Sequence, residues 1–238
     1  DDYAKDGDAT DEKKVVKEGV SEYFMFSVEG SETISNGWSK RMPAVRADGV
    51  SFDIVYRLRT YQYGPRPVRF FIWRNDDEHE LGESPLPDGI VRVFRENGND
   101  GLSYLGQQVL RYVPIQSAIE VNLGTDDLVV FEQQKTKTRR NNFQFDRHDR
   151  VSGWDEHQDW TGSVRNYRGK AIAIDVRLQL AGDVDFTPTV PTTSFDYRTV
   201  ETKLQTDRRG KSVFPFSATI HHGTNAKQSR VKIGRAHV

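Results

Sequence analysis

Residues 172–180 read Ile-Ala-Ile-Asp-Val-Arg-Leu-Gln-Leu, and a large aliphatic side chain stands at every second position of this stretch. Successive side chains of a β-strand point to opposite faces, so this pattern predicts a strand with one buried and one wet face. A helix would need its apolar residues three and four positions apart. Residues 172–180 therefore predict a β-strand that is buried on one face.

The same alternation recurs along the chain from Tyr23 onward. The apolar members of these runs are Phe24, Phe26 and Val28; Phe52, Ile54, Tyr56 and Leu58; Val68, Phe70 and Ile72; Ile119, Val121 and Leu123; and Phe214, Phe216, Ala218 and Ile220. Turn-forming pairs such as Asn36-Gly37, Asp48-Gly49 and Arg209-Gly210 separate the runs. We expect an all-β protein with little helix, an antiparallel β-sandwich built as one large or two abutting β subdomains.

Composition limits the classes of function. The 238 residues carry 34 Lys plus Arg against 35 Asp plus Glu, a formal net charge of -1 that disfavours a nucleic-acid partner. No apolar run is long enough to cross a bilayer, so we expect no membrane span. Cysteine is absent, which removes disulfides, thiolate metal ligands and cysteine nucleophiles.

Both ends of the chain are set apart from the predicted domain. Residues 1–20 are charged and are interpreted as a linker or the end of an upstream segment. Residues 21–231 form the predicted β-sandwich domain. Residues 232–238 end in Ile-Gly-Arg-Ala-His-Val and resemble a translated sequencing adapter, so we expect no functional residue in this tail.

One segment carries a family resemblance. Leu81-Gly82, Pro85-Leu86-Pro87, Gly89 and Val91–Phe94, followed by Leu105-Gly106, resemble a motif in the C-terminal domain of the mucoidy-inhibitor-A-like family, a bacterial domain of uncharacterised function. Weaker similarity follows at Pro114, at 119–130 and at 165–176. The stretch 135–162 is longer than in that family, and residues 182–186 replace an aromatic-rich segment. The resemblance implies a β-rich module of the bacterial periplasm or cell envelope, placed after a helical or coiled-coil region, without catalytic residues.

Two tryptophans are candidate ligand contacts. Trp154 and Trp160 lie in the stretch 135–162, which its polarity predicts to be a loop. Exposed aromatic faces beside carboxylates and amides are typical of sugar-binding surfaces. The alternative is that the two rings anchor the loop onto the sandwich, because aromatic side chains bury large areas. We favour the anchor and keep a glycan partner as the alternative.

The same stretch gathers acidic and histidine side chains: Asp146, His148, Asp149, Asp155, Glu156, His157 and Asp159. They could serve a metal ion or a hydrolase, but they show neither the order of an EF-hand nor the His-Glu-x-x-His spacing, and neighbouring arginines compete for the carboxylates. The local basic group Lys135, Lys137, Arg139 and Arg140 is interpreted as a solvated face. The adjacent pair His221-His222 should point to opposite sides of a strand and so cannot share a metal.

These observations assign no catalytic, cofactor-binding or metal-binding residue. We expect a non-catalytic interaction or structural module that works with a protein partner or with an upstream helical region of the same polypeptide. A carbohydrate-binding module using Trp154 and Trp160 is one alternative. A hydrolase with its site among residues 146–159 is the other.

Overall fold

The structure is a computed structural model that describes residues 15–20, 23–28, 31, 33–39, 45–196 and 198–226. Strands dominate these residues, and the helical segments are two single turns, α1 (Thr60–Tyr63) and the 3-10 turn η1 (Asp77–His79). The predicted all-β class with little helix is confirmed.

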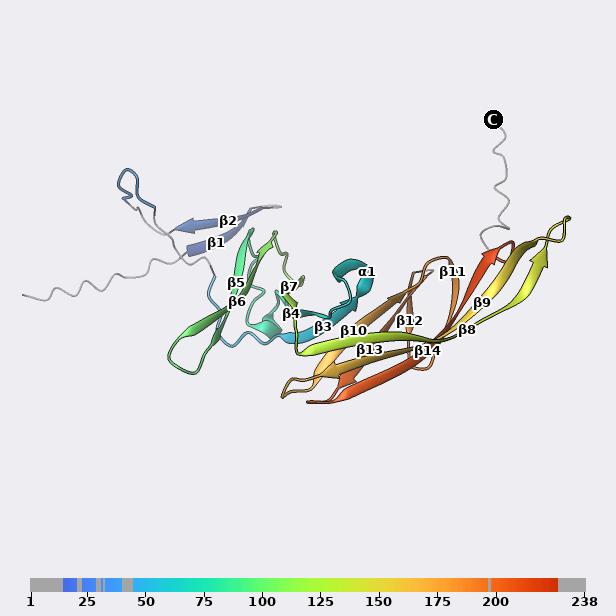
Figure 1. The fold of residues 1–238 in the computed structure, drawn as a ribbon. Coiled ribbons are helices and arrows are strands. Elements are labelled where there is room, and N and C mark those ends of the chain that lie inside the picture. Colours follow the sequence, from blue (N-terminus) through green and yellow to red (C-terminus); the bar gives the residue numbers. More distant parts are fainter. Residues whose placement is uncertain are drawn as a thin grey trace, which may run out of the picture. The chain divides into compact units, whose positions relative to one another are not determined.

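Two larger sheets carry most of the strands (Figure 1). The six-stranded sheet has the spatial order β12 (Thr193–Asp196), β13 (Thr199–Thr206), β10 (Ile172–Gln179), β3 (Asp53–Arg59), β4 (Val68–Arg74) and β7 (Ala118–Thr125). The four-stranded sheet has the order β11 (Asp183–Pro188), β14 (Lys211–Gly223), β9 (Val151–Asn166) and β8 (Val129–Phe145). Two hairpins are separate sheets, β1 (Val15–Val20) with β2 (Tyr23–Val28) and β5 (Gly89–Glu96) with β6 (Leu102–Leu110).

One strand pair departs from the antiparallel expectation. β3 and β10 run parallel, with Ile174 opposite Tyr56 and Val176 opposite Leu58. These two strands are far apart in the sequence, so no tight hairpin dictates their direction. The six-stranded sheet is therefore mixed rather than purely antiparallel.

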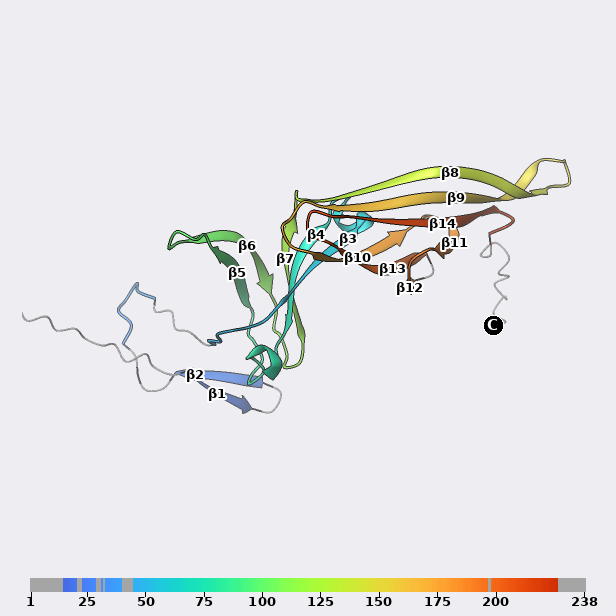
Figure 2. The ribbon, with the colours of Figure 1, turned by 90° about the horizontal axis from the view of Figure 1, so that it is seen from below.

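The two larger sheets pack face to face around one apolar core (Figure 2). β10 supplies the alternating residues that the sequence singled out, and β3 adds Tyr56 and Leu58. The four-stranded sheet contributes from the other side. Its buried members are Val129, Val164, Phe214 and Phe216. The sandwich follows from period-two burial: Ile172, Ile174, Val176 and Leu178 are all buried, whereas the residues between them are half-exposed.

The chain divides into two compact units. The larger comprises residues 53–72, 92–108 and 120–238 and contains the sandwich core. The smaller comprises residues up to 52, 73–91 and 109–119. It contains the fully buried Asn75, whose side-chain amide donates to the carbonyl of Ser84 and whose Oδ1 accepts from the backbone N–H of Gly82. An isolated bridge pairs Leu86 with Val113 in the same unit.

The expected terminal segments are only partly described. Residues 15–20, which were assigned to a charged linker or the end of an upstream segment, form β1 and pair with β2. The β-branched Val15, Val16 and Val20 favour a strand there. Residues 1–14 and the expected tail 232–238 lie outside the described residues. Among the described helices, none has the length and apolarity that a membrane span requires.

Candidate functional site

The stretch predicted to be a polar loop is a long antiparallel hairpin. Residues 135–162 belong to β8 and β9, which pair from Val129 opposite Asn166 to Phe145 opposite Val151. The turn between them is closed by a hydrogen bond from the N–H of Asp146 to the carbonyl of Arg150. Both views show this hairpin extending past the strands of the six-stranded sheet (Figures 1 and 2). The loop prediction is therefore wrong, because polar side chains on both faces hid the strand period.

The acidic and histidine cluster predicted from sequence is split into three places. Asp146, His148 and Asp149 lie at the hairpin turn. Asp155, His157 and Asp159 lie on β9 and face away from the sandwich core, while Glu156 points to the opposite, inner face. At about 3.3 Å per residue, Asp159 is roughly 30 Å along the strand from the turn. Within the described residues, no group of three or more His, Asp or Glu side chains is arranged to hold a metal ion.

Trp154 and Trp160 lie on the inner face of β9, each half-buried. Trp160 packs against the core, and its ring stacks on Phe216 at 6.1 Å between centroids. Its indole N–H donates to Gln158. The position of Trp160 agrees with the anchor interpretation, although its support is a strand rather than a loop.

Trp154 is further along β9 and is not a member of the core cluster. It stacks on His222 at 4.8 Å and has the Arg140 guanidinium 5.8 Å from a ring centroid. Lys135 approaches Trp160 in the same way at 5.6 Å. Each tryptophan therefore lies between a ring of β14 and a cation of β8, so little of either indole face is offered to a sugar.

The adjacent histidines point to opposite faces, as the sequence predicted. His222 contacts Trp154 on the inner face, whereas His221 contacts Asp155 on the outer face. The basic group is divided in the same way. Arg140 pairs with Glu156 at 2.8 Å on the inner face, and Arg139 lies 3.7 Å from Asp159 on the outer face.

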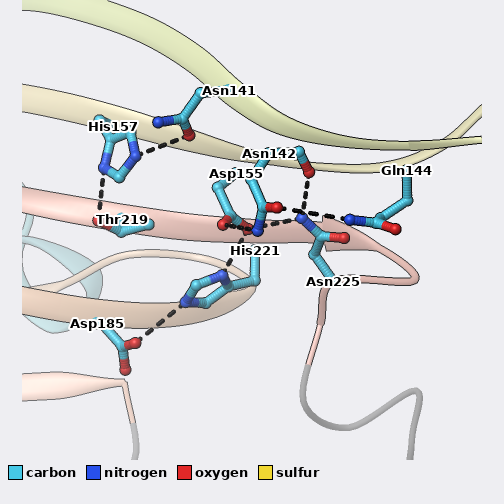
Figure 3. Close-up of polar contacts among 9 residues, drawn as sticks. All are labelled: Asn141, Asn142, Gln144, Asp155, His157, Asp185, Thr219, His221 and Asn225. Carbon is cyan, nitrogen blue, oxygen red and sulfur yellow. Dashed lines mark hydrogen bonds and ion pairs between the residues drawn. The ribbon is translucent and has the colours of Figure 1, made fainter.

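The outer face of the four-stranded sheet carries a connected polar network centred on Asp155 (Figure 3). Asp155 accepts hydrogen bonds from the side-chain amides of Asn142 at 2.7 Å and Asn225 at 3.0 Å. Nδ1 of His221 lies 2.7 Å from its Oδ1. The other ring nitrogen of His221, Nε2, lies 3.1 Å from Oδ2 of Asp185. The imidazole thus joins β9, β14 and β11.

The ionisation of this network follows from its contacts. Burial raises the pKa of the Asp155 carboxyl, but the hydrogen bonds from Asn142, His221 and Asn225 outweigh burial and bring the pKa to about 2. Burial likewise lowers the pKa of His221, but the hydrogen bonds to Asp155 and Asp185 outweigh it and raise the pKa above its ordinary value. The arrangement therefore favours an imidazolium between two carboxylates.

On the same face, Thr219, His157 and Asn141 stand in the order hydroxyl, imidazole and amide, which is the order of groups that activates a nucleophile. Oγ1 of Thr219 lies 2.9 Å from Nδ1 of His157, and Nε2 of His157 lies 2.9 Å from Oδ1 of Asn141. Thr219 and His157 are directly paired residues of two interior strands, β14 and β9. Backbone N–H groups at these positions serve the ladders, so they are not available to stabilise an oxyanion. The set supports strand pairing rather than acyl transfer.

Sequence reasoning missed several members of these networks, among them Asn141, Asn142, Asp185, Thr219 and Asn225. They come from four separate segments, and only the strand register brings them together. A search of protein-family profiles, curated protein sequences and solved structures found no match to this chain.

Proposed function

We propose that this chain is a non-catalytic interaction module and that it binds an extended, acidic segment of a protein partner along the free edge of β8. The observation that carries the proposal is the exposure of this edge. β8 is the terminal strand of its sheet, and every residue from Glu132 to Phe145 is exposed. Within the described part of the chain it pairs with β9 alone. An uncovered strand edge is a template for an added strand.

A hollow beside the beginning of β8 supports the same proposal. Its lining includes Pro65, Arg66, Val129, Val130 and Phe131, and its volume is about 530 Å³. Val130 is itself exposed, and Phe131 is half-buried against the sandwich core. An added strand at this edge could place an apolar side chain in the hollow, which would fix its register.

The charge of β8 indicates which kind of strand fits. Lys135, Lys137 and Arg139 follow one another along the exposed edge strand. If a second copy added its β8 antiparallel about Thr138, Lys137 would face Arg139, and like charges opposite each other destabilise a strand pair. An acidic strand meets no such repulsion. The basic residues therefore disfavour self-association and favour an acidic partner.

The glycan and hydrolase hypotheses are less well supported. Trp154 and Trp160 are flanked by β14 rings and β8 cations. The histidines of the outer face have both ring nitrogens engaged. The resemblance to the mucoidy-inhibitor-A-like domain, and the envelope location that it implies, stay predictions that are compatible with an interaction module.

The test uses a short synthetic peptide in which glutamate alternates with valine, and a counterpart with lysine in place of glutamate. We expect the acidic peptide to bind in a fluorescence-anisotropy titration, the basic one not to bind, and added salt to weaken the binding. Failure of the acidic peptide to bind would refute the acidic partner.

A matched pair of variants locates the binding edge. Gln133→Pro and Gln134→Pro each remove one N–H group, and neighbouring residues of a strand direct these groups to opposite edges. One variant therefore breaks the ladder to β9 and lowers the melting temperature, while the other loses only a free-edge donor. The variant that loses only the free-edge donor should keep its stability, because its ladder to β9 is intact. It should bind the acidic peptide about tenfold more weakly, the loss of roughly one hydrogen bond. Undiminished binding by that variant would exclude the β8 edge.

A further inference from the structure

The outward face of the six-stranded sheet contains a cavity that the interaction function does not use. The residues opposite one another there are known from the register: Ala173 lies between Val55 of β3 and Gln205 of β13, and Asp175 lies between Arg57 and Lys203. All point away from the core that Ile172, Ile174 and Val176 form. Ala173 is the smallest side chain of its row, so the surface dips above it.

The dip is a cavity of about 260 Å³ with two chemically different ends. Val55, Ile72 and Ala173 line an apolar end. Arg57, Asp175 and Lys203 line a polar end one row further along the strands. Drug-sized ligands occupy cavities of about 300 Å³ or more, so this one suits a smaller molecule with an apolar part and a charged head.

The ion pairs around the cavity determine which side chains can bind the charged head of a ligand. Arg57 is held by two hydrogen bonds to Glu120, each 2.6 Å, which neutralise its guanidinium. Asp175 contacts Arg59 through Oδ2 at 3.3 Å, while its Oδ1 is buried and has no hydrogen-bond partner. An ionised carboxylate has about four lone-pair sites, and the contact to Arg59 occupies one of them. Asp175 can therefore accept from a donor in the cavity.

Lys203 supplies a positive charge at the polar end of the cavity. Its side chain is exposed and lines the cavity, and the residue lies directly across the strand pair from Asp175. Among the residues that the structure describes, no carboxylate forms an ion pair with it. Nε of Arg57 is likewise buried without an acceptor. The polar end thus presents one acceptor and one uncommitted cation, next to an apolar floor.

From this geometry we propose that the cavity binds a free α-amino acid with an aliphatic side chain. The α-ammonium group donates to Asp175, the α-carboxylate accepts from Lys203, and the side chain covers Ala173 and contacts Val55 and Ile72. A simple carboxylic acid would place a second negative charge beside Asp175. A simple amine would leave Lys203 without a partner. A zwitterion satisfies both groups.

The test is a calorimetric titration of the whole chain with L-leucine, glycine, N-acetyl-L-leucine and L-leucinamide. We expect leucine to bind saturably. Each of the other three compounds lacks one of the three contacts, so each should bind more weakly than leucine by about tenfold or more. If leucine does not bind, or if the two blocked forms bind as tightly as leucine, the zwitterion site is wrong.

Variants then place the ligand in the cavity. Lys203→Met removes an exposed cation and should weaken leucine binding about tenfold while leaving leucinamide binding unchanged, because leucinamide lacks the carboxylate. Ala173→Leu fills the floor and should abolish leucine binding. Lys211→Met, an exposed lysine on β14, is the matched control and should bind leucine like the wild type. Since Lys203 is exposed, its variant remains decisive if Ala173→Leu does not fold; unchanged leucine binding by Lys203→Met would overturn the proposal.

Discussion

Nδ1 of His221 lies 2.7 Å from Oδ1 of Asp155, and this contact joins directly paired residues of β14 and β9. The second ring nitrogen reaches Asp185 on β11, so a single imidazole connects three of the four strands of its sheet. Both side chains are largely buried. The network thus makes the stability of the sheet depend on pH.

The folded pKa of His221 is raised above 6.5, so its stabilising contribution is complete below pH 6.5 and is lost as the pH rises through the raised pKa. The folded pKa of Asp155 is about 2 against an ordinary 3.8, so its contribution is complete above pH 3.8 and is lost as the pH falls towards 2. The pair therefore stabilises the fold most between these two ordinary values.

His221→Gln tests this window by denaturant unfolding at several pH values. We expect the variant to lose ~1–2 kcal/mol of unfolding free energy at about pH 5 and clearly less at about pH 9. His148→Gln, at the exposed hairpin turn, should follow the wild type at every pH. An equal loss for His221→Gln at both pH values would show that the imidazole is uncharged in the sheet.

Tyr56 is a buried member of the sandwich core. Its hydroxyl donates to Oδ2 of Asp126 at 2.6 Å, and burial followed by this bond raises its pKa to about 12. Because the neutral phenol is favoured in the folded state, its stabilisation is present below pH 10 and is lost above it.

Tyr56→Phe should therefore lower the free energy of unfolding by ~1–2 kcal/mol at neutral pH, the cost of leaving a buried acceptor without one donor. Ultraviolet titration of the wild type should show one tyrosine that ionises late and is missing from the variant. Tyr167→Phe, which alters an exposed ring, should leave stability unchanged. A tyrosine titration identical in wild type and Tyr56→Phe would contradict the buried hydrogen bond.

The core was predictable where one face of a strand is apolar. Ile172, Ile174, Val176 and Leu178 alternate with polar residues in sequence and are buried alternately in the structure. The same rule fails at the N-terminal end of β3, where Ile54 is exposed although it belongs to the same alternating run as Tyr56 and Leu58. Periodicity predicts on which face of the sheet a side chain lies. How far along the strand that face is buried depends on the extent of the facing sheet.

The hairpin of β8 and β9 was missed for a related reason. Glu156 and Gln158 on the inner face alternate with Asp155 and His157 on the outer face, so both faces are polar and no period-two pattern appears. Opposite charges such as Arg140 and Glu156 were visible in the sequence, but only the register makes them partners. The polar network around Asp155 was unpredictable for the same reason, since its members come from distant segments.

The two tryptophans of β9 differ in their contact with the core. Trp160 packs against the core and Trp154 does not. Trp160→Ala should therefore cost ~3 kcal/mol or more of unfolding free energy, and Trp154→Ala should cost less. Denaturant unfolding measures both.

The same variants address glycan binding. Because rings and cations flank both indoles, we expect no change of tryptophan fluorescence on titration with a panel of glycans. Quenching that is lost in Trp154→Ala or Trp160→Ala would instead establish the carbohydrate-binding alternative.

A glycine and an aromatic ring approach each other closely inside the sandwich. Gly162 on β9 lies directly opposite Phe214 on β14, and a Cβ atom at Gly162 would lie 2.4 Å from Cζ of the Phe214 ring. Phe214 is 1% exposed and is surrounded by the core, so its ring cannot move aside without disturbing other residues. Gly162→Ala should therefore lower the free energy of unfolding by ~1–3 kcal/mol, the usual cost of overpacking.

Two further variants identify the ring as the cause. Gly169→Ala is the control, because no atom lies within 4 Å of the added methyl group, and it should change stability by less than about 0.5 kcal/mol. Phe214→Leu removes the aromatic ring, so the double variant Gly162→Ala/Phe214→Leu should be more stable than the sum of the two single losses predicts. If the two losses add within about 0.5 kcal/mol, the glycine is required by something other than the ring of Phe214.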